Sequence, residues 1–139
     1  MAPCTFCSIA GGEMAAHVVV DEPEVVAFLD VRPVFKGHLL VVTRRHRDTL
    51  ADLDRGELAT LFVAVQRLAV AVETALGAGG CWVSVNNRVS QSVPHVHAHV
   101  VPRTKGDGLR GFFWPRTKYD DDAEAAGYAD RLRAAYQQG

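Results

Sequence analysis

The run His95-Val96-His97-Ala98-His99-Val100-Val101 constrains the fold more than any other part of this sequence, because polar and apolar residues alternate along it. This alternation predicts a β-strand, in which successive side chains point to opposite faces. The three histidines should therefore share one face, with neighbours about 6.5–7 Å apart along the strand. Three imidazoles are costly to bury against an apolar core unless each finds a partner. The run therefore indicates a polar site that can supply a nucleophile, a proton carrier, or an anion or metal ligand.

The composition is typical of one soluble domain. The 139 residues are 48% hydrophobic and 22% charged, and the net charge of −1 gives no electrostatic basis for general nucleic-acid binding. No apolar run approaches membrane-spanning length, and residues 1–4 lack the regions of a signal peptide. We therefore expect a cytoplasmic protein with no nucleic-acid or membrane partner. The odd number of cysteines, three, argues against a disulfide framework.

Hydrophobic patterning predicts an α+β fold with antiparallel strands. The predicted strands cover residues 17–20, 25–30, 38–43, 81–87 and the histidine run. Between the third and fourth strands, apolar residues from Leu58 to Leu76 follow helical spacing. Asp54 with Glu57 resembles a capping box at the start of this long helix, and Gly77 is a plausible stop.

The end of the chain predicts one more helix. Residues 120–122 are three aspartates that can cap a helix extending to about Tyr136. No repeat, linker or second domain is evident. We expect a single domain over residues 1–139, with a core at about 4–115 and a C-terminal helical extension at about 116–139.

Five sequence blocks, in register, resemble the histidine triad (HIT) superfamily of nucleotide hydrolases and transferases. The resemblance extends from about Cys4 to Pro115. The blocks are Cys4-Thr5-Phe6-Cys7, Ala27-Phe28-Leu29-Asp30, Gly37-His38-Leu39-Leu40-Val41-Val42, Gln91-Ser92-Val93, and the histidine run followed by Pro102-Arg103. The resemblance implies a HIT-like fold, in which a five-stranded antiparallel sheet carries helices. It also implies a two-fold homodimer whose two sheets join.

The resemblance further implies a set of catalytic residues. The middle histidine of the family attacks the α-phosphate of a nucleotide, and this role falls on His97. A neutral imidazole is a competent nucleophile near pH 7, and water or another acceptor would then remove the nucleotide from it. His99 would stabilise charge on the phosphate, and Ser92 would hydrogen-bond the phosphate or the leaving group. His38 would help to fix the triad.

Other positions match the family's nucleotide-binding residues. Asp30 corresponds to the carboxylate that holds the ribose hydroxyls, and a carboxylate can accept two hydrogen bonds from a cis-diol. Gln91 would act beside Ser92 at the phosphate. The apolar wall around the base is matched by Phe6, Ile9, Phe28 and Val31, for which plain core packing is the alternative interpretation.

The phosphate-side loop departs from the family pattern. Asn86 or Asn87 matches an asparagine at the end of the fourth strand, and the sequence leaves the choice open. Members of the family often follow this asparagine with a glycine-rich loop, whereas residues 86–91 are shorter and contain no glycine. Glycine lets backbone amides approach phosphate through unusual dihedral angles. The form of the loop therefore stays open as well.

Cys4 and Cys7 form a C-x-x-C pair that, taken alone, fits a redox motif, half of a zinc site or chance. No βαβ pattern surrounds the pair, so a thioredoxin-like context is missing. One branch of the family completes a zinc site with a histidine after the third strand and the first triad histidine, which here are His46 and His95. Four such ligands would make a closed, structural Zn²⁺ site and leave His97 free for chemistry.

Three functions compete. The first is hydrolysis of purine nucleotide conjugates, namely AMP-amine phosphoramidates, through a nucleotidyl-histidine. The second is hydrolysis of diadenosine polyphosphates, and the third is nucleotide binding without catalysis, which the intact His97 disfavours. The sequence leaves the leaving group and the preferred base open. Residues 110–115, which include Trp114, would border the leaving-group side by their position.

Overall fold

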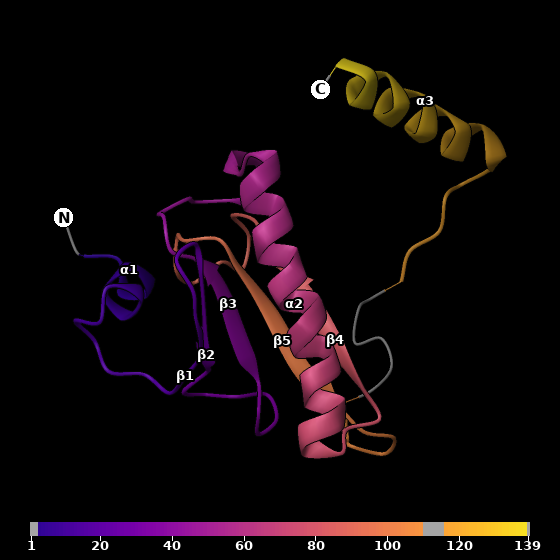
Figure 1. Ribbon diagram of the computed structural model, residues 1–139. Helices are drawn as coiled ribbons and strands as arrows, with labels where there is room; N and C mark the ends of the chain where they lie inside the picture. Colours follow the sequence, from indigo (N-terminus) through magenta and orange to yellow (C-terminus); the bar gives the residue numbers. More distant parts are fainter. Residues whose placement is uncertain (1–2, 110–115, 139) are drawn as a thin grey trace. The chain divides into compact units, whose positions relative to one another are not determined.

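The computed structural model describes residues 3–109 and 116–138 (Figure 1). The chain divides into two compact units, residues 1–107 and 108–139. The first unit contains α1 (Thr5–Ala10), β1 (Val18–Asp21), β2 (Val25–Leu29), β3 (Leu39–Thr43), the 3₁₀ helix η1 (Leu50–Asp52), α2 (Arg55–Leu76), β4 (Gly80–Val85) and β5 (His97–Arg103). The second contains α3 (Asp122–Gln138).

The strands form one antiparallel sheet in the order β1-β2-β3-β5-β4, which confirms the predicted fold class. β3 pairs with β5 so that Leu40 lies opposite His99 and Val42 lies opposite His97. Because β5 has a partner on each side, its histidines lie inside the sheet and not at an edge. The two edges differ: β4 keeps a regular register, whereas the register of β1 shifts within the strand.

Helix α2 begins and ends where its sequence predicts. The Asp54 Oδ1 atom accepts a hydrogen bond from the Glu57 amide at 2.8 Å, and the Glu57 Oε1 atom accepts one from the Asp54 amide at 3.4 Å. These two bonds complete a capping box. Gly77 ends the helix in the left-handed conformation, with φ 69° and ψ 20°, which glycine adopts without a steric penalty.

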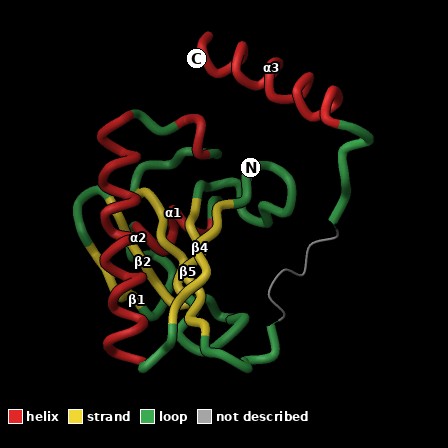
Figure 2. The backbone as a smooth tube through the Cα atoms, turned by 90° about the vertical axis from the view of Figure 1, so that its right-hand side faces the viewer, coloured by secondary structure: helices red, strands yellow, loops and turns green. Residues whose placement is uncertain are grey.

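One face of α2 packs on the sheet. Its buried side chains recur at helical spacing: Leu61, Ala64, Val65, Leu68 and Val72. In Figure 2 the helix runs along one side of the strands. By length and composition α2 could also cross a membrane, although Arg67 and Glu73 interrupt its apolar run. Its buried residues instead belong to a hydrophobic cluster shared with the strands, as expected for a core helix.

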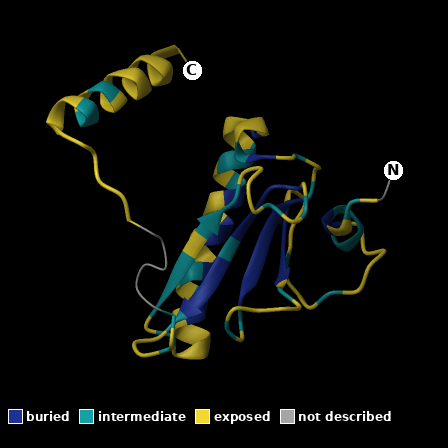
Figure 3. Cartoon of the chain, turned by 180° about the vertical axis from the view of Figure 1, so that it is seen from behind, coloured by how far each residue is buried: buried dark blue, intermediate teal, exposed yellow. Residues whose placement is uncertain are grey.

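The sheet carries a different hydrophobic cluster on each face, because side chains alternate along each strand. The cluster under α2 includes the strand residues Val25, Ala27, Leu39, Val41, Ala98 and Val100. The cluster under α1 consists of Phe6, Ala10, Val26, Phe28, Leu40 and Val42. The central strands are buried accordingly (Figure 3). His97 and His99 alternate with Ala98 and Val100, so they lie on the α1 side.

The histidine run is not a strand over its whole length. We predicted a strand from His95, but β5 begins at His97. The His95 amide donates to the backbone oxygen of Val93 in a turn, while the Nε2 atom of its ring lies 2.7 Å from the backbone oxygen of Thr43, the last residue of β3. The His95 side chain therefore contacts β3 at the point where its backbone has left the sheet. The other strand boundaries lie within two residues of the predicted ones.

Two short helices, α1 and η1, were not predicted. Their six and three residues are shorter than the window over which hydrophobic periodicity is read. The apolar residues Phe6, Ile9 and Ala10 do fall at helical spacing, and Cys4 caps the helix by accepting a hydrogen bond from the Cys7 amide. The helical spacing of these residues can therefore be recognised only once the boundaries of α1 are known.

The second unit contains the predicted C-terminal helix. Helix α3 begins at Asp122, and the Glu124 amide donates to the Asp121 carboxylate at 2.8 Å. None of its described residues is buried, as Figure 3 shows. The centroids of the Tyr128 and Tyr119 rings lie 5.5 Å apart, and the Arg131 guanidinium lies 4.5 Å from the centroid of the Tyr128 ring. The predicted Trp114 segment lies outside the described residues, and the predicted single domain stays a prediction.

Candidate active site and metal centre

A cavity of about 410 Å³ lies on the α1 side of the sheet, which is within the size range of small-molecule sites. Eight residues that the sequence assigned to a nucleotide site line it: Phe6, Ile9, Phe28, Asp30, Val31, Ser92, His97 and His99. They come from α1, β2, β5 and the loops that follow β2 and precede β5. The fold therefore brings together most of the predicted site.

The apolar wall of this cavity is of two kinds. Phe6 and Phe28 are buried in the α1-side cluster, with ring centroids 5.4 Å apart, so they serve as core and cavity wall at once. Val31 is 88% exposed and lies at the rim. The sequence did not single out Leu40 and Val93, which also line the cavity. The sequence signal for them is their place in two of the blocks that resemble the family, beside predicted site residues.

His97 has the tautomer that a nucleophile needs. Its Nδ1 atom lies 2.7 Å from the backbone oxygen of His95, and a carbonyl oxygen can only accept, so Nδ1 carries the proton. The lone pair is therefore on Nε2. Phe6 packs edge-on against the same ring, with centroids 5.0 Å apart, and His97 is only 3% exposed. Backbone and packing thus fix the ring before a substrate binds.

His99 is oriented by a chain of hydrogen bonds that starts at the backbone. The Val34 amide donates to the Nδ1 atom of His38 at 3.1 Å, so His38 carries its proton on Nε2. That Nε2 donates to the Nδ1 atom of His99 at 2.9 Å. His99 therefore carries its own proton on Nε2, as a hydrogen-bond donor. This is the tautomer required to contact a phosphate oxygen.

His38 and His99, the two histidines linked by this hydrogen bond, are both neutral near pH 7. Burial, and then the neighbouring His97 and His38, lower the pKa of His99 to about 4. Burial also lowers the pKa of His38, although the nearby Asp30 carboxylate opposes the effect. A neutral pair is needed for this pattern, because protonating the Nδ1 atom of His99 would break its bond to His38. Burial therefore preserves the chain.

Asp30 lies next to this chain. One carboxylate oxygen is 3.7 Å from the Nε2 atom of His38, and the other accepts a hydrogen bond from the Arg32 amide at 2.9 Å. The ligand atoms of Asp30, His38 and His99 lie within 4.8 Å of one another, as in a metal site. However, His38 has a proton on the nitrogen that faces the group, and a protonated nitrogen cannot bind a metal. We therefore interpret the group as a hydrogen-bond network.

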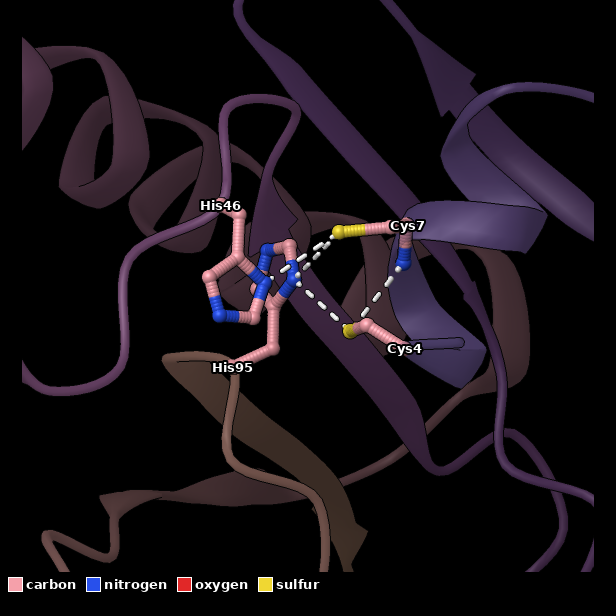
Figure 4. Close-up of side chains that lie close together, drawn as sticks. All are labelled: Cys4, Cys7, His46 and His95. Carbon is pink, nitrogen blue, oxygen red and sulfur yellow. Dashed lines mark hydrogen bonds between the residues drawn. The ribbon is translucent and has the colours of Figure 1, made fainter. Parts of the chain in front are cut away.

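A second group of ligand atoms brings together Cys4, Cys7, His46 and His95 (Figure 4). The Sγ–Nδ1 distance is 3.4 Å from Cys4 to His95, 3.2 Å from Cys7 to His46 and 3.5 Å from Cys7 to His95. A tetrahedral Zn²⁺ ion about 2.3 Å from sulfur and about 2.0–2.1 Å from nitrogen requires S···N separations of roughly 3.5 Å. These residues therefore fit a Cys₂His₂ zinc site in donor type and in spacing.

The hydrogen bonds around the two histidine ligands prepare them for a metal. The Nε2 atom of His95 donates to the backbone oxygen of Thr43 at 2.7 Å, and that of His46 donates to the Asp48 carboxylate at 2.8 Å. The lone pair of each ring is therefore on the Nδ1 atom that faces the cysteines. Sequence reasoning missed Asp48, although a carboxylate two residues after a ligand histidine is a usable signal.

The Cys7 thiol is protonated at neutral pH when no metal is bound. Burial and the neighbouring Cys4 raise the pKa of Cys7 to about 11. A metal binds the thiolate, so binding must displace this proton. The affinity for a metal should therefore increase with pH.

The side-chain amides of the loop from Asn86 to Pro94 bond backbone groups, some within the loop and some in the segment that follows β3. The Asn86 side chain donates to the backbone oxygen of Ser90 at 3.3 Å, and the Asn87 side chain accepts from the Leu50 amide at 2.8 Å. Gln91 bonds backbone groups at both ends of its amide. None of these three side chains lines the cavity. Contact of Asn86 or Gln91 with a phosphate stays a prediction.

Sequence comparison identifies relatives across most of the chain. The HIT domain family matches residues 11–106. An uncharacterised HIT-like protein of Methanocaldococcus jannaschii is 42% identical over 107 residues, which cover 76% of this chain and 82% of that protein. An adenosine 5′-monophosphoramidase of Candida albicans is 28% identical over 127 residues, covering 87% and 84% of the two chains. A bis(5′-nucleosyl)-tetraphosphatase of Schizosaccharomyces pombe is 36% identical over 83 residues, covering 58% and 46%.

Solved structures agree with these relatives. A protein of Streptococcus mutans is 29% identical with a TM-score of 0.84, covering 98% of this chain and 87% of the other. A zinc-bound histidine triad family protein of Mycobacterium smegmatis is 34% identical with a TM-score of 0.73, covering 97% and 94%. The family match, the relatives and the geometry of the three histidines lead to one conclusion: this chain belongs to the HIT family.

Proposed function

We propose that this protein is a nucleotide hydrolase that cleaves AMP-amine phosphoramidates through a nucleotidyl-histidine. The tautomer of His97 carries this proposal, because the His95 backbone oxygen holds the Nδ1 proton and leaves the Nε2 lone pair for attack. A nucleotide-binding module would not need this arrangement. Among relatives, the adenosine 5′-monophosphoramidase of Candida albicans supports the choice of substrate.

In the proposed first step, the Nε2 atom of His97 forms a bond to the α-phosphorus while the P–N bond to the amine breaks. The leaving amine takes up a proton from solvent, for which the Ser92 hydroxyl, which lines the cavity, is a candidate relay. The Nε2–H group of His99 donates to a phosphate oxygen and stabilises its charge. Water then attacks the phosphorus, which releases AMP and restores neutral His97.

The rest of the cavity would hold the nucleoside. The Asp30 carboxylate can accept hydrogen bonds from the ribose hydroxyls. The two buried phenylalanines, Phe6 and Phe28, offer an apolar surface for a purine base, with Ile9 and Val31 nearer the rim. A bound Zn²⁺ ion would supply structure and not chemistry, because four protein ligands leave it no open position. It would hold α1, which carries Phe6, against the strand that carries His97.

Hydrolysis of diadenosine polyphosphates is the alternative activity, since a Schizosaccharomyces pombe relative is a bis(5′-nucleosyl)-tetraphosphatase. Both reactions begin with the same attack by His97 and differ in the leaving group. We also propose a homodimer that joins two β4 edges, because β4 is the regular edge of the sheet and Val83 is 39% exposed on it. A cytoplasmic location stays a prediction.

The proposal is tested by turnover of an AMP-lysine phosphoramidate and of diadenosine tetraphosphate, compared as kcat/KM. His97→Ala should abolish turnover of the preferred substrate. The exposed histidine His17 provides a matched control, and His17→Ala should keep full activity. Equal turnover by wild type and His97→Ala would exclude the proposed nucleophile. A higher kcat/KM for the dinucleotide would establish the alternative activity.

A further inference from the structure

The loop that carries Ser92 is strained. Among the described non-glycine residues, Arg88 and Ser90 have positive φ values, 69° and 61°. This left-handed region costs a residue with a side chain roughly 1 kcal/mol or more relative to glycine. The loop contains no glycine, so other interactions must hold it in this form.

Gln91 provides two of these interactions. Its Oε1 atom accepts a hydrogen bond from the Arg88 amide at 2.8 Å, and this bond spans the strained turn of residues 88–91. Its Nε2 atom donates to the backbone oxygen of Asp48 at 2.6 Å, which ties the turn to a segment far away in sequence. Both ends of the amide are therefore used by backbone groups, and the half-buried side chain does not line the cavity.

The segment at the other end of this bond belongs to the metal centre. Asp48 accepts the hydrogen bond from His46, and the Nδ1 atom of His46 lies 3.2 Å from the Cys7 sulfur. Asn87 adds a second bond to the same segment, because its side chain accepts from the Leu50 amide at 2.8 Å. Residues 46–50 and 86–91 are thus joined by two side chains.

We infer that Gln91 is a positioning residue, which holds the Ser92 loop in its strained form and ties that loop to the metal-binding segment through Asp48. It acts on the reaction through Ser92 and not by contact with the phosphate. The metal centre and the phosphate side of the cavity then share one support. The catalytic consequence rests on the proposed function, whereas the bond to the metal-binding segment does not.

The first test compares Gln91→Met with Gln66→Met, which makes the same change at an exposed position of α2. Both proteins are loaded with one equivalent of Zn²⁺, and release of the ion to a chromogenic chelator is followed without nucleotide. Gln91→Met should release Zn²⁺ about 3- to 10-fold faster than wild type, because Asp48 loses a support. Gln66→Met should match wild type. Equal release rates for all three proteins, or failure of the wild type to bind Zn²⁺, would overturn the inference.

The second test separates positioning from direct contact. Gln91→Met should lower kcat/KM for the AMP-lysine substrate about 10-fold, the effect of losing roughly one net hydrogen bond to the loop. Ser90→Gly relieves strain in the same loop, so it should restore about 3-fold in the Gln91→Met background and change wild type less than about 2-fold. An activity loss that Ser90→Gly does not rescue would indicate contact with the substrate and contradict positioning.

The two tests also separate this inference from the proposed function. A wild-type protein that turns over neither nucleotide substrate would defeat the proposed function. In that case the Zn²⁺ release rates of Gln91→Met and Gln66→Met still show whether Gln91 supports the metal-binding segment through Asp48. Ser90→Gly alone poses little threat to folding, because glycine adopts the observed φ of 61° without a steric penalty.

Discussion

The two faces of the sheet are held in different ways. On one face lies α2, a 22-residue helix with a complete capping box and a buried apolar stripe. On the other lies α1, a six-residue helix that is too short to be stable by itself. Its links to the sheet include Phe6 and the Cys4 and Cys7 side chains. Arg44 adds a hydrogen bond to the backbone oxygen of Ala10.

This difference separates stability from chemistry. The buried cluster shared by α2 and the sheet is apolar, so it can be packed for stability alone. The α1 side must leave room for a cavity and must bury His97, which limits its apolar contacts. Metal ligation by the proposed Cys₂His₂ site would replace part of a core there. We therefore expect substitutions on the α2 side to change the free energy of unfolding and those on the α1 side to change activity and metal binding.

The largest effects should come from one buried residue on each face. His97→Ala should lower kcat at least about 10⁴-fold, because it removes the nucleophile. Leu61→Ala should lower the free energy of unfolding by about 2–5 kcal/mol, because this α2 side chain is fully buried against the sheet, yet the folded fraction should keep its kcat. Urea unfolding and steady-state kinetics on both variants would measure this. A large loss of kcat in folded Leu61→Ala would break the distinction between the faces.

Loss of the cysteine ligands should affect the α1 side alone. Cys4→Ser/Cys7→Ser should lose the metal and bind AMP about 10-fold more weakly, because α1 then holds Phe6 less firmly. Cys81→Ser in β4 is the matched control and should keep its metal. Metal analysis and titration calorimetry with AMP would measure both effects. If the double variant bound AMP as wild type does, α1 would not depend on the metal.

Acid should destabilise the protein through the α1 side. His99 has a pKa of about 4 when folded and about 6.5 when unfolded, so between these values only the unfolded chain binds the proton. Above about pH 6.5 the titration of His99 does not change the free energy of unfolding. As the pH is lowered from about 6.5 to about 4, the free energy of unfolding falls. Allowing for the partial exposure of His99, we expect its titration to lower the free energy of unfolding by about 1–2 kcal/mol at pH 5.

Urea unfolding at pH 7.5 and pH 5 would measure this contribution. The loss on acidification should be smaller in His99→Gln by that amount, because the amide does not titrate. The lowered pKa values of His38 and His95 act in the same direction and remain in both proteins. An identical loss in wild type and His99→Gln would show that His99 is not buried as neutral imidazole.

The smallest effect should come from Asp48, which supports a ligand without binding the metal. Asp48→Asn keeps a hydrogen-bond acceptor for His46 but removes the negative charge, so the affinity for Zn²⁺ should fall about 10-fold. Competition with a chelator of known affinity would measure it. Asp52→Asn in the nearby η1 helix is the control and should leave the affinity unchanged. A lower Zn²⁺ affinity in Asp52→Asn together with an unchanged affinity in Asp48→Asn would contradict the role of Asp48 and assign the support of His46 to Asp52.

The sequence predicted the sheet and α2 because their signals are local. Alternation marked β5, and Asp54, Glu57 and Gly77 marked the ends of α2. The four proposed metal ligands were also predicted together, through family resemblance, and the structure brings them within ligand distance. The pattern could not show that His95 precedes β5, because its bonds run to Thr43 and Val93 and not to a strand ladder.

The loop before β5 was the least predictable part of the site. Its form depends on bonds from Gln91 and Asn87 to residues 48–50, which no local pattern reveals. The absence of glycine indicated a departure from the family pattern. It gave no indication that Arg88 and Ser90 take the left-handed conformation themselves.

The central claim is that the Nε2 atom of His97 forms a bond to the α-phosphorus. The most direct test is rapid quenching of wild-type protein during turnover of AMP-lysine, with peptide mass spectrometry under conditions that preserve P–N bonds. We predict an adenylyl group on His97 and on neither His95 nor His99. Full turnover with no adenylylated peptide, or adenylylation of another histidine, would contradict the account.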